Sequence, residues 1–125
     1  MMKTIATDKA PKAAGPYSQA IVANGFAFLS GQIAIDPQSN QFLGGSIEQQ
    51  AKQVLNNLSS VLQSMGSSLN KAVKTTVFLK DMADFDTMNK IYSEFFPEHK
   101  PARSTIQVAR LPKDAAIEIE MIALV

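Results

Sequence analysis

The chain has 125 residues, 46% of them hydrophobic and 18% charged, and its 12 lysines and arginines nearly balance 11 aspartates and glutamates. This length and composition predict one folded domain spanning residues 1–125 and exclude a disordered, highly charged chain. The near-neutral charge argues against nucleic acid as a partner, because phosphate contacts normally supply most of the affinity for it.

Two scarce residue types narrow the possible chemistry further. The chain has no cysteine and a single histidine, His99. The absence of cysteine excludes disulfides, thiolate metal sites and cysteine nucleophiles. The single histidine nearly excludes a histidine-rich metal site and a serine–histidine triad. We expect neither a metal nor a cofactor.

No segment approaches the roughly 18 apolar residues of a membrane helix, and residues 1–14 lack the apolar core of a signal peptide. We expect a cytoplasmic protein without a membrane partner.

The first predicted elements are two strands joined by a tight turn. Gln19–Ala23 and Phe26–Ser30 flank Asn24-Gly25, the dipeptide that best adopts the positive φ angles of a hairpin turn. Asp36-Pro37 and Ser39–Gly45, which ends in a pair of glycines, are predicted to form a loop.

A long helix is predicted after this loop. Between Ile47 and Met65 the apolar residues recur at steps of three and four, which places them on one helical stripe. Ser46 and Gln49 have the spacing of a capping box, and Gly66 stands where a left-handed C-terminal residue is favoured.

The second half of the chain predicts strand, helix, strand and strand. Ala72–Leu79 is rich in β-branched residues, a helix is expected from about Asp84 to Pro97, and Ala102–Ala109 and Ala116–Val125 have strand character. Two helices among five strands predict an α+β domain with a mixed sheet and both helices on one face.

The other face of that sheet is also predicted to be apolar. Side chains alternate along a strand, so Phe26 and Phe28 lie opposite Ala27, while Ile122 and Leu124 lie opposite Ala123. Soluble monomers rarely expose such a patch. We therefore expect a second copy of the chain to cover it.

Two charged groups are the best candidates for a site. Arg103 begins a strand of mostly small or apolar residues, where its guanidinium can grip a carboxylate with two parallel hydrogen bonds, or form a structural salt bridge. Glu118 and Glu120 share one face of a strand that continues into Ile122. The two carboxylates either lie on a solvated outer face of an edge strand or are half-buried. A half-buried carboxylate has a raised proton affinity, which suits it to general acid–base catalysis.

Weaker candidates lie in two loops and one helix. The Tyr17 hydroxyl can bind a ligand or simply pack a turn, and Ser30-Gly31 can admit a ligand close to the backbone or form a bulge. Asn89 is more typical of a solvent-facing helix position than of a ligand contact.

Several of these segments occur in one order: residues 15–19, 30–32, 101–104, 108–114 and 117–120. In that order the whole chain resembles the Rid family, also called YjgF, the reactive-intermediate deaminases. The resemblance implies a chorismate-mutase-like α+β fold assembled as a homotrimer with pockets at the subunit interfaces. It also implies hydrolysis of small 2-imino acids, 2-iminobutanoate and 2-iminopropanoate, to 2-oxo acids and ammonia without a cofactor.

The resemblance also implies roles for individual residues. Arg103 matches the arginine that binds the substrate carboxylate, Glu118 matches the acid that handles water, and Tyr17 is the third predicted catalytic residue. The predicted substrate-binding residues are Arg103, Tyr17, Ser30, Gly31, Asn89 and Thr105, the last standing where many relatives have cysteine. The alternatives are a non-catalytic regulatory protein that senses 2-oxo or imino acids and, less favoured, a ribonuclease.

Overall fold

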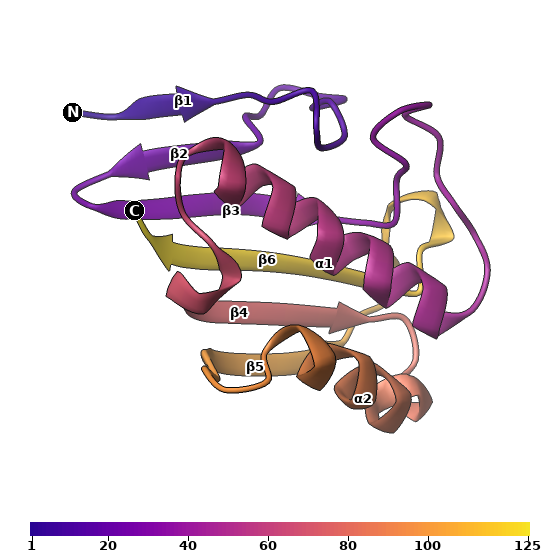
Figure 1. Ribbon diagram of the computed structural model, residues 1–125. Helices are drawn as coiled ribbons and strands as arrows, with labels where there is room; N and C mark the ends of the chain where they lie inside the picture. Colours follow the sequence, from indigo (N-terminus) through magenta and orange to yellow (C-terminus); the bar gives the residue numbers. More distant parts are fainter.

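The computed structural model describes residues 1–125 as one six-stranded sheet with two helices on one of its faces (Figure 1). The strand order is β1-β2-β3-β6-β4-β5, and every neighbouring pair is antiparallel except β4 and β5, which α2 connects. The predicted α+β class and the one-sided placement of the helices are confirmed. The elements are β1 Lys3–Ile5, β2 Ala20–Ala23, β3 Phe26–Gln32, α1 Ile47–Ser64, β4 Ala72–Leu79, α2 Phe85–Phe95, β5 Ala102–Gln107 and β6 Ile117–Leu124, with short 3-10 turns at Leu69–Lys71, Met82–Asp84 and Pro112–Asp114.

The hairpin of β2 and β3 forms at the predicted turn. Asn24 and Gly25 have φ angles of 53° and 80°, and the strands pair from Ala23 opposite Phe26 to Ala20 opposite Leu29. Both turn residues are left-handed, which matches the twist of the flanking strands.

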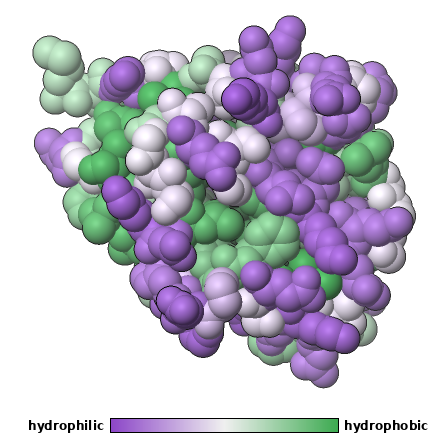
Figure 2. All heavy atoms as spheres, in the orientation of Figure 1, coloured by the Kyte–Doolittle hydropathy of each residue, from purple (hydrophilic) through white to green (hydrophobic).

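Helix α1 also follows its sequence signals. Ser46 and Gln49 make the reciprocal hydrogen bonds of a capping box, and Gly66, just past the helix, has a φ of 78°. Its buried stripe packs on the sheet, while hydrophilic side chains cover much of this side of the molecule (Figure 2). Hydrophobic surface on this side gathers near the β2–β3 turn and the C-terminus. No helix combines the length and apolar character needed to span a membrane.

The core lies between the helices and the sheet face beneath them. Val77 of β4 and Ile119 of β6 are completely buried, as are Leu55 of α1 and Met88 of α2. Each such side chain contributes roughly 1.5–3 kcal/mol of burial free energy. The helices therefore anchor β4 and β6, and β6 carries the two carboxylates of the site described below.

The opposite sheet face has no covering element within the chain. Phe28 of β3, Leu124 of β6 and Ile106 of β5 are 45–47% exposed, and their strand neighbours Ala27 and Ala123 are buried. The prediction that both faces are apolar is confirmed. What covers the open face stays a prediction.

One strand of the sheet was not expected, and the order of the strands was not predicted. Strand β1 was not predicted, because it is three residues long and buries only Ile5. The final two strands, β5 and β6, are not neighbours, because β4 lies between them. The loop that connects β5 to β6 turns at Lys113 and Asp114, which have φ angles of 58° and 55°. Strand order depends on long-range pairing, which residue patterns within each strand do not encode.

Candidate functional site

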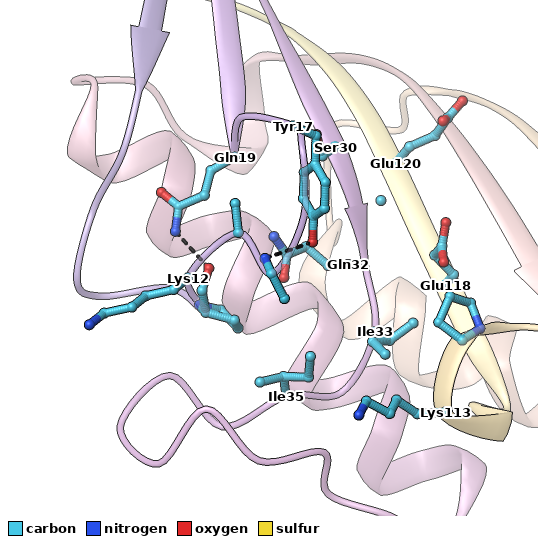
Figure 3. Close-up of a pocket in the computed structure, with 15 residues that line it drawn as sticks. Lys12, Tyr17, Gln19, Ser30, Gln32, Ile33, Ile35, Lys113, Glu118 and Glu120 are labelled. Atoms are coloured by element: carbon cyan, nitrogen blue, oxygen red, sulfur yellow. Dashed lines mark hydrogen bonds between the residues drawn. The ribbon is translucent and has the colours of Figure 1, made fainter.

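A cavity of about 590 Å³ opens where the end of β3 meets the start of β6 (Figure 3). We call it the Glu118 hollow. Glu118 and Glu120 line it from alternate positions of β6, with the Glu120 carboxyl pointing outward, and Tyr17 lies across from Glu118 on the loop before β2. Its lining includes Tyr17, Ser30, Gly31, Lys113, Glu118 and Glu120.

Gly31 brings the backbone of β3 against the Glu118 carboxyl. The β3–β6 register shifts between Leu29 and Gln32, so Gly31 lies in a bulge. A Cβ atom added to Gly31 would collide with Glu118, lying 2.8 Å from its Cδ and closer still to Oε2. The missing side chain therefore makes room for the carboxyl.

Glu118 is a half-buried carboxyl without a hydrogen-bond or ion-pair partner in the chain. Burial raises its pKa above the usual range, and the neighbouring charge of Glu120 raises it further. This confirms the expectation of increased proton affinity on this apolar face. A carboxyl with increased proton affinity is suited to taking up a proton and returning it during a reaction.

The two hydroxyl groups of the hollow are already partly engaged. Tyr17 is 53% exposed, and its hydroxyl accepts a weak hydrogen bond of 3.4 Å from the Ala14 amide. The Ser30 hydroxyl donates to the carbonyl of Ser18 at 2.6 Å. Ser30 thus fixes the loop that carries Tyr17. Because its hydroxyl proton is used in this bond, the Ser30 oxygen can only accept a hydrogen bond from a ligand.

Buried Gln19 holds the outer wall of the hollow. Its side chain accepts from the Thr7 amide at 2.7 Å and donates to the carbonyls of Thr7 and Pro11 at 3.1 and 2.7 Å. Residues 11–14 line the cavity directly after this clamp. Sequence reasoning missed this role, although a glutamine at the start of an apolar strand is a possible signal of a buried amide.

Arg103 lies in a second cavity, of about 380 Å³, between α2 and β5. Its guanidinium carbon is 4.8 Å from the centroid of the Tyr92 ring, and the chain's single ion pair, Lys80 with Asp114, is elsewhere. The structural salt bridge considered for Arg103 is therefore not formed within the chain. Five donors of the guanidinium remain for an outside anion.

Of the other predicted residues, Asn89 lines this cavity, which we call the Arg103 hollow, and Thr105 lies two residues after Arg103 on the same face of β5. Asn89 is not simply solvent-facing: its Oδ1 is buried and has no hydrogen-bond partner, and the same holds for Oγ1 of Thr105. Buried polar atoms are normally paired. An unpaired acceptor beside an unpaired cation is an arrangement that a polar ligand can complete.

The two hollows lie on opposite faces of the sheet. Arg103 pairs in register with Thr75, which is buried on the helix side, whereas Glu118 pairs with Phe78 on the open side. The two side chains are therefore separated by about 10 Å along the strands and by two strand spacings of about 4.8 Å. One chain brings Tyr17, Ser30, Gly31 and Glu118 together and does not bring Arg103 to them.

Comparisons with known proteins find relatives that match almost the whole chain. A protein-family model described as endoribonuclease L-PSP matches residues 7–125. Human 2-iminobutanoate/2-iminopropanoate deaminase is 46% identical over 122 residues, which cover 98% of this chain and 89% of the human protein.

Two crystal structures match almost the whole chain. YyfA of Yersinia pestis, described as a member of the conserved Rid protein family, has 44% identity and a TM-score of 0.98, with 100% of both chains covered. TdcF of Escherichia coli, with bound serine, has 42% identity and a TM-score of 0.93, with 98% of both chains covered. This chain therefore belongs to the Rid family, also called YjgF, which the endoribonuclease L-PSP model describes.

Proposed function

We propose that this protein is a deaminase that hydrolyses small 2-imino acids, 2-iminobutanoate and 2-iminopropanoate among them, to 2-oxo acids and ammonia. The observation that carries the proposal is the unpaired Glu118 carboxyl, seated against Gly31 with a raised pKa. The name of the human relative supports this reaction. The serine bound to TdcF, a small molecule with a carboxylate and a nitrogen, supports this ligand class.

The reaction needs one group that moves a proton and one that holds the carboxylate. Water adds to the carbon of the protonated C=N bond while the Glu118 carboxylate takes one proton from it, giving a carbinolamine. Glu118 returns that proton to the nitrogen and the C–N bond breaks. Ammonia leaves while the hydroxyl gives its proton to the Glu118 carboxylate and becomes the carbonyl, and Glu118 releases this proton to solvent before the next turnover. Tyr17 and the Gly31 backbone orient the water and the nitrogen in this scheme, and Arg103 holds the carboxylate.

We further propose that the working assembly is a homotrimer in which Arg103 of one copy faces Glu118 of another. Two observations support this arrangement. The apolar face with Phe28 and Leu124 has no cover within the chain, and Arg103 and Glu118 lie on opposite sides of the same sheet. In a cyclic assembly one face of each copy meets a different face of the next, so each interface can hold one complete site.

An imine-trapping assay tests the reaction. A pyridoxal-dependent dehydratase supplies the imine, semicarbazide captures what survives, and added protein is expected to lower the captured fraction. Glu118→Gln should lose activity by about 10²–10⁴-fold and still bind 2-oxobutanoate, because only the proton transfer is removed. Arg103→Ala should lose both binding and turnover. Trapping unchanged by the native protein for both imines would contradict the proposal.

A mixing experiment tests the shared site. Glu118→Gln and Arg103→Ala chains, each inactive alone, are unfolded together and refolded at equal amounts. About one quarter of the native activity should return, because in a random ring each interface joins an intact Arg103 to an intact Glu118 with a chance of one half times one half. If both residues act within one chain, no activity returns.

The two alternative functions, a regulatory sensor of 2-oxo or imino acids and a ribonuclease, would give different results in these tests. A sensor of 2-oxo acids would bind 2-oxobutanoate through Arg103, and Glu118→Gln would change nothing measurable. A ribonuclease would cleave RNA after rigorous purification and lose that activity on Glu118→Gln. The charge balance of 12 basic and 11 acidic residues disfavours RNA as the ligand.

A further inference from the structure

The surroundings of Arg103 are aromatic rather than acidic. Its guanidinium carbon lies 4.8 Å from the centroid of the Tyr92 ring and 5.8 Å from that of Phe85. Both distances are within the range in which a cation is attracted to a ring face. The guanidinium is half-buried and has no carboxylate of the chain within ion-pair distance. The rings therefore hold the cation while leaving its hydrogen-bond donors free.

Tyr92 is itself fixed at both ends. Its hydroxyl is hydrogen-bonded to Thr75 Oγ1 at 2.7 Å, and its ring packs against Phe96 with centroids 4.7 Å apart. Tyr92 and Thr75 are buried, and Thr75 is the register partner of Arg103 across β4 and β5. The ring is thus tied to the strand next to the one that carries the guanidinium.

Tyr92 is not suited to moving a proton in the reaction. Its hydroxyl is committed to Thr75, and burial raises its pKa, so the phenol keeps its proton at neutral pH. A ring that is rigid, uncharged and close to the cation can nevertheless determine where that cation points.

We propose that Tyr92 is the positioning residue of Arg103: its tethered ring holds the guanidinium in the orientation that receives a ligand carboxylate through two hydrogen bonds. This inference rests on the proposed function for the identity of the ligand, a 2-imino or 2-oxo acid. Planar, bidentate recognition requires a fixed guanidinium plane, and an untethered arginine loses rotamer entropy when it binds. The Phe85 ring also attracts the Arg103 guanidinium, from a greater distance of 5.8 Å.

The free protein offers a test that needs no ligand. Ring currents should shift the side-chain NH resonances of Arg103 upfield in the nuclear magnetic resonance spectrum of the native protein. Tyr92→Phe should keep the shift and Tyr92→Leu should abolish it. Resonances of native Arg103 at free-arginine positions would overturn the proposal, whether or not the protein is a deaminase.

Ligand binding provides the second test, by calorimetry with 2-oxobutanoate. Tyr92→Leu should weaken binding about tenfold, the size of one partly desolvated cation–ring contact, while Tyr92→Phe stays within about threefold of native. In the imine assay KM should rise with little change in kcat, because the proton-transfer group is untouched. Ile91→Val, a core change on the same helix at a residue that does not line the Arg103 cavity, is the matched control and should leave affinity near native.

A double-mutant cycle separates positioning from general damage. The second background is Arg103→Lys, which keeps a cation for the carboxylate but lacks the planar fork that the ring is proposed to orient. Tyr92→Leu should cost clearly less affinity there than in the native protein, and an equal loss in both backgrounds would overturn the proposal. Should Tyr92→Leu fail to fold, Phe85→Leu at its half-buried position is expected to show the same pattern with a smaller loss. A native protein that binds 2-oxobutanoate through Arg103 and leaves imines intact would refute the deaminase and retain this role of Tyr92.

Discussion

Replacing Gly31 by alanine tests how closely the Glu118 carboxyl depends on the bulge in β3. The new Cβ would lie 2.8 Å from Cδ and 3.1 Å from Cγ of Glu118. Ordinary carbon–carbon contact begins at about 3.5 Å, so the carboxyl has to move by at least about 0.7 Å. The colliding atoms belong to the end of a flexible side chain rather than to the backbone, so the movement falls on Glu118 itself.

The expected loss of activity follows from that displacement. A misplacement of about 1 Å at a reacting group costs on the order of 10²-fold in rate, which corresponds to about 2.7 kcal/mol of transition-state stabilisation. Folding should be little affected. Gly31 does not need a positive φ, and a Gly→Ala change at such a position stabilises by about 0.4–1 kcal/mol through the unfolded state, offsetting part of the local strain.

The assay is kcat/KM for 2-iminobutanoate together with thermal unfolding. Gly44→Ala is the matched control, because a Cβ there meets no atom within 4 Å. Gly31→Ala should lose about 10²-fold in kcat/KM with a melting temperature close to native, and Gly44→Ala should change neither. Native activity in Gly31→Ala would refute the close-approach reasoning, and so would a loss of activity that merely tracks unfolding.

Three further changes probe the charge, the wall and the open face. Glu120→Gln removes a neighbouring charge that raises the pKa of Glu118, so the acid limb of the pH–rate profile should move to lower pH; a limb that stays in place or moves up contradicts this coupling. Gln19→Leu leaves buried amide and carbonyl groups of residues 7–11 unpaired and should lower the free energy of unfolding in urea by about 2–4 kcal/mol; a loss below about 1 kcal/mol would show that water replaces the clamp. Phe28→Asp should convert the native assembly to folded single chains that do not hydrolyse imines, as measured by sedimentation and circular dichroism, because this exposed ring makes no core contact; a native mass would place the interface elsewhere.

The local structure was largely predictable because its signals are short-range. The turn at Asn24-Gly25 and the capping box of Ser46 with Gln49 depend only on residues within one turn of the chain, and both formed where predicted. The apolar open face and the raised proton affinity of Glu118 followed from strand alternation, which is equally local.

The arrangement of the site was not predictable in the same way. The registers of β5 and β6 against β4 place Arg103 and Glu118 on opposite faces, and these registers depend on pairings between distant segments. The contact of Tyr92 with Arg103 likewise requires α2 to pack over β5, which helical periodicity alone does not specify. Side-chain alternation predicts which residues share a face of one strand, but it leaves the partners across strands open.

Under the proposed shared-site arrangement, the separation of Arg103 and Glu118 by the thickness of the sheet makes catalysis depend on protein concentration. Under the shared-site arrangement, a dilute solution holds well-folded chains that have each half of the machinery and cannot turn over substrate. Specific activity should then fall on dilution without any spectroscopic sign of unfolding, and recover when the protein is concentrated again.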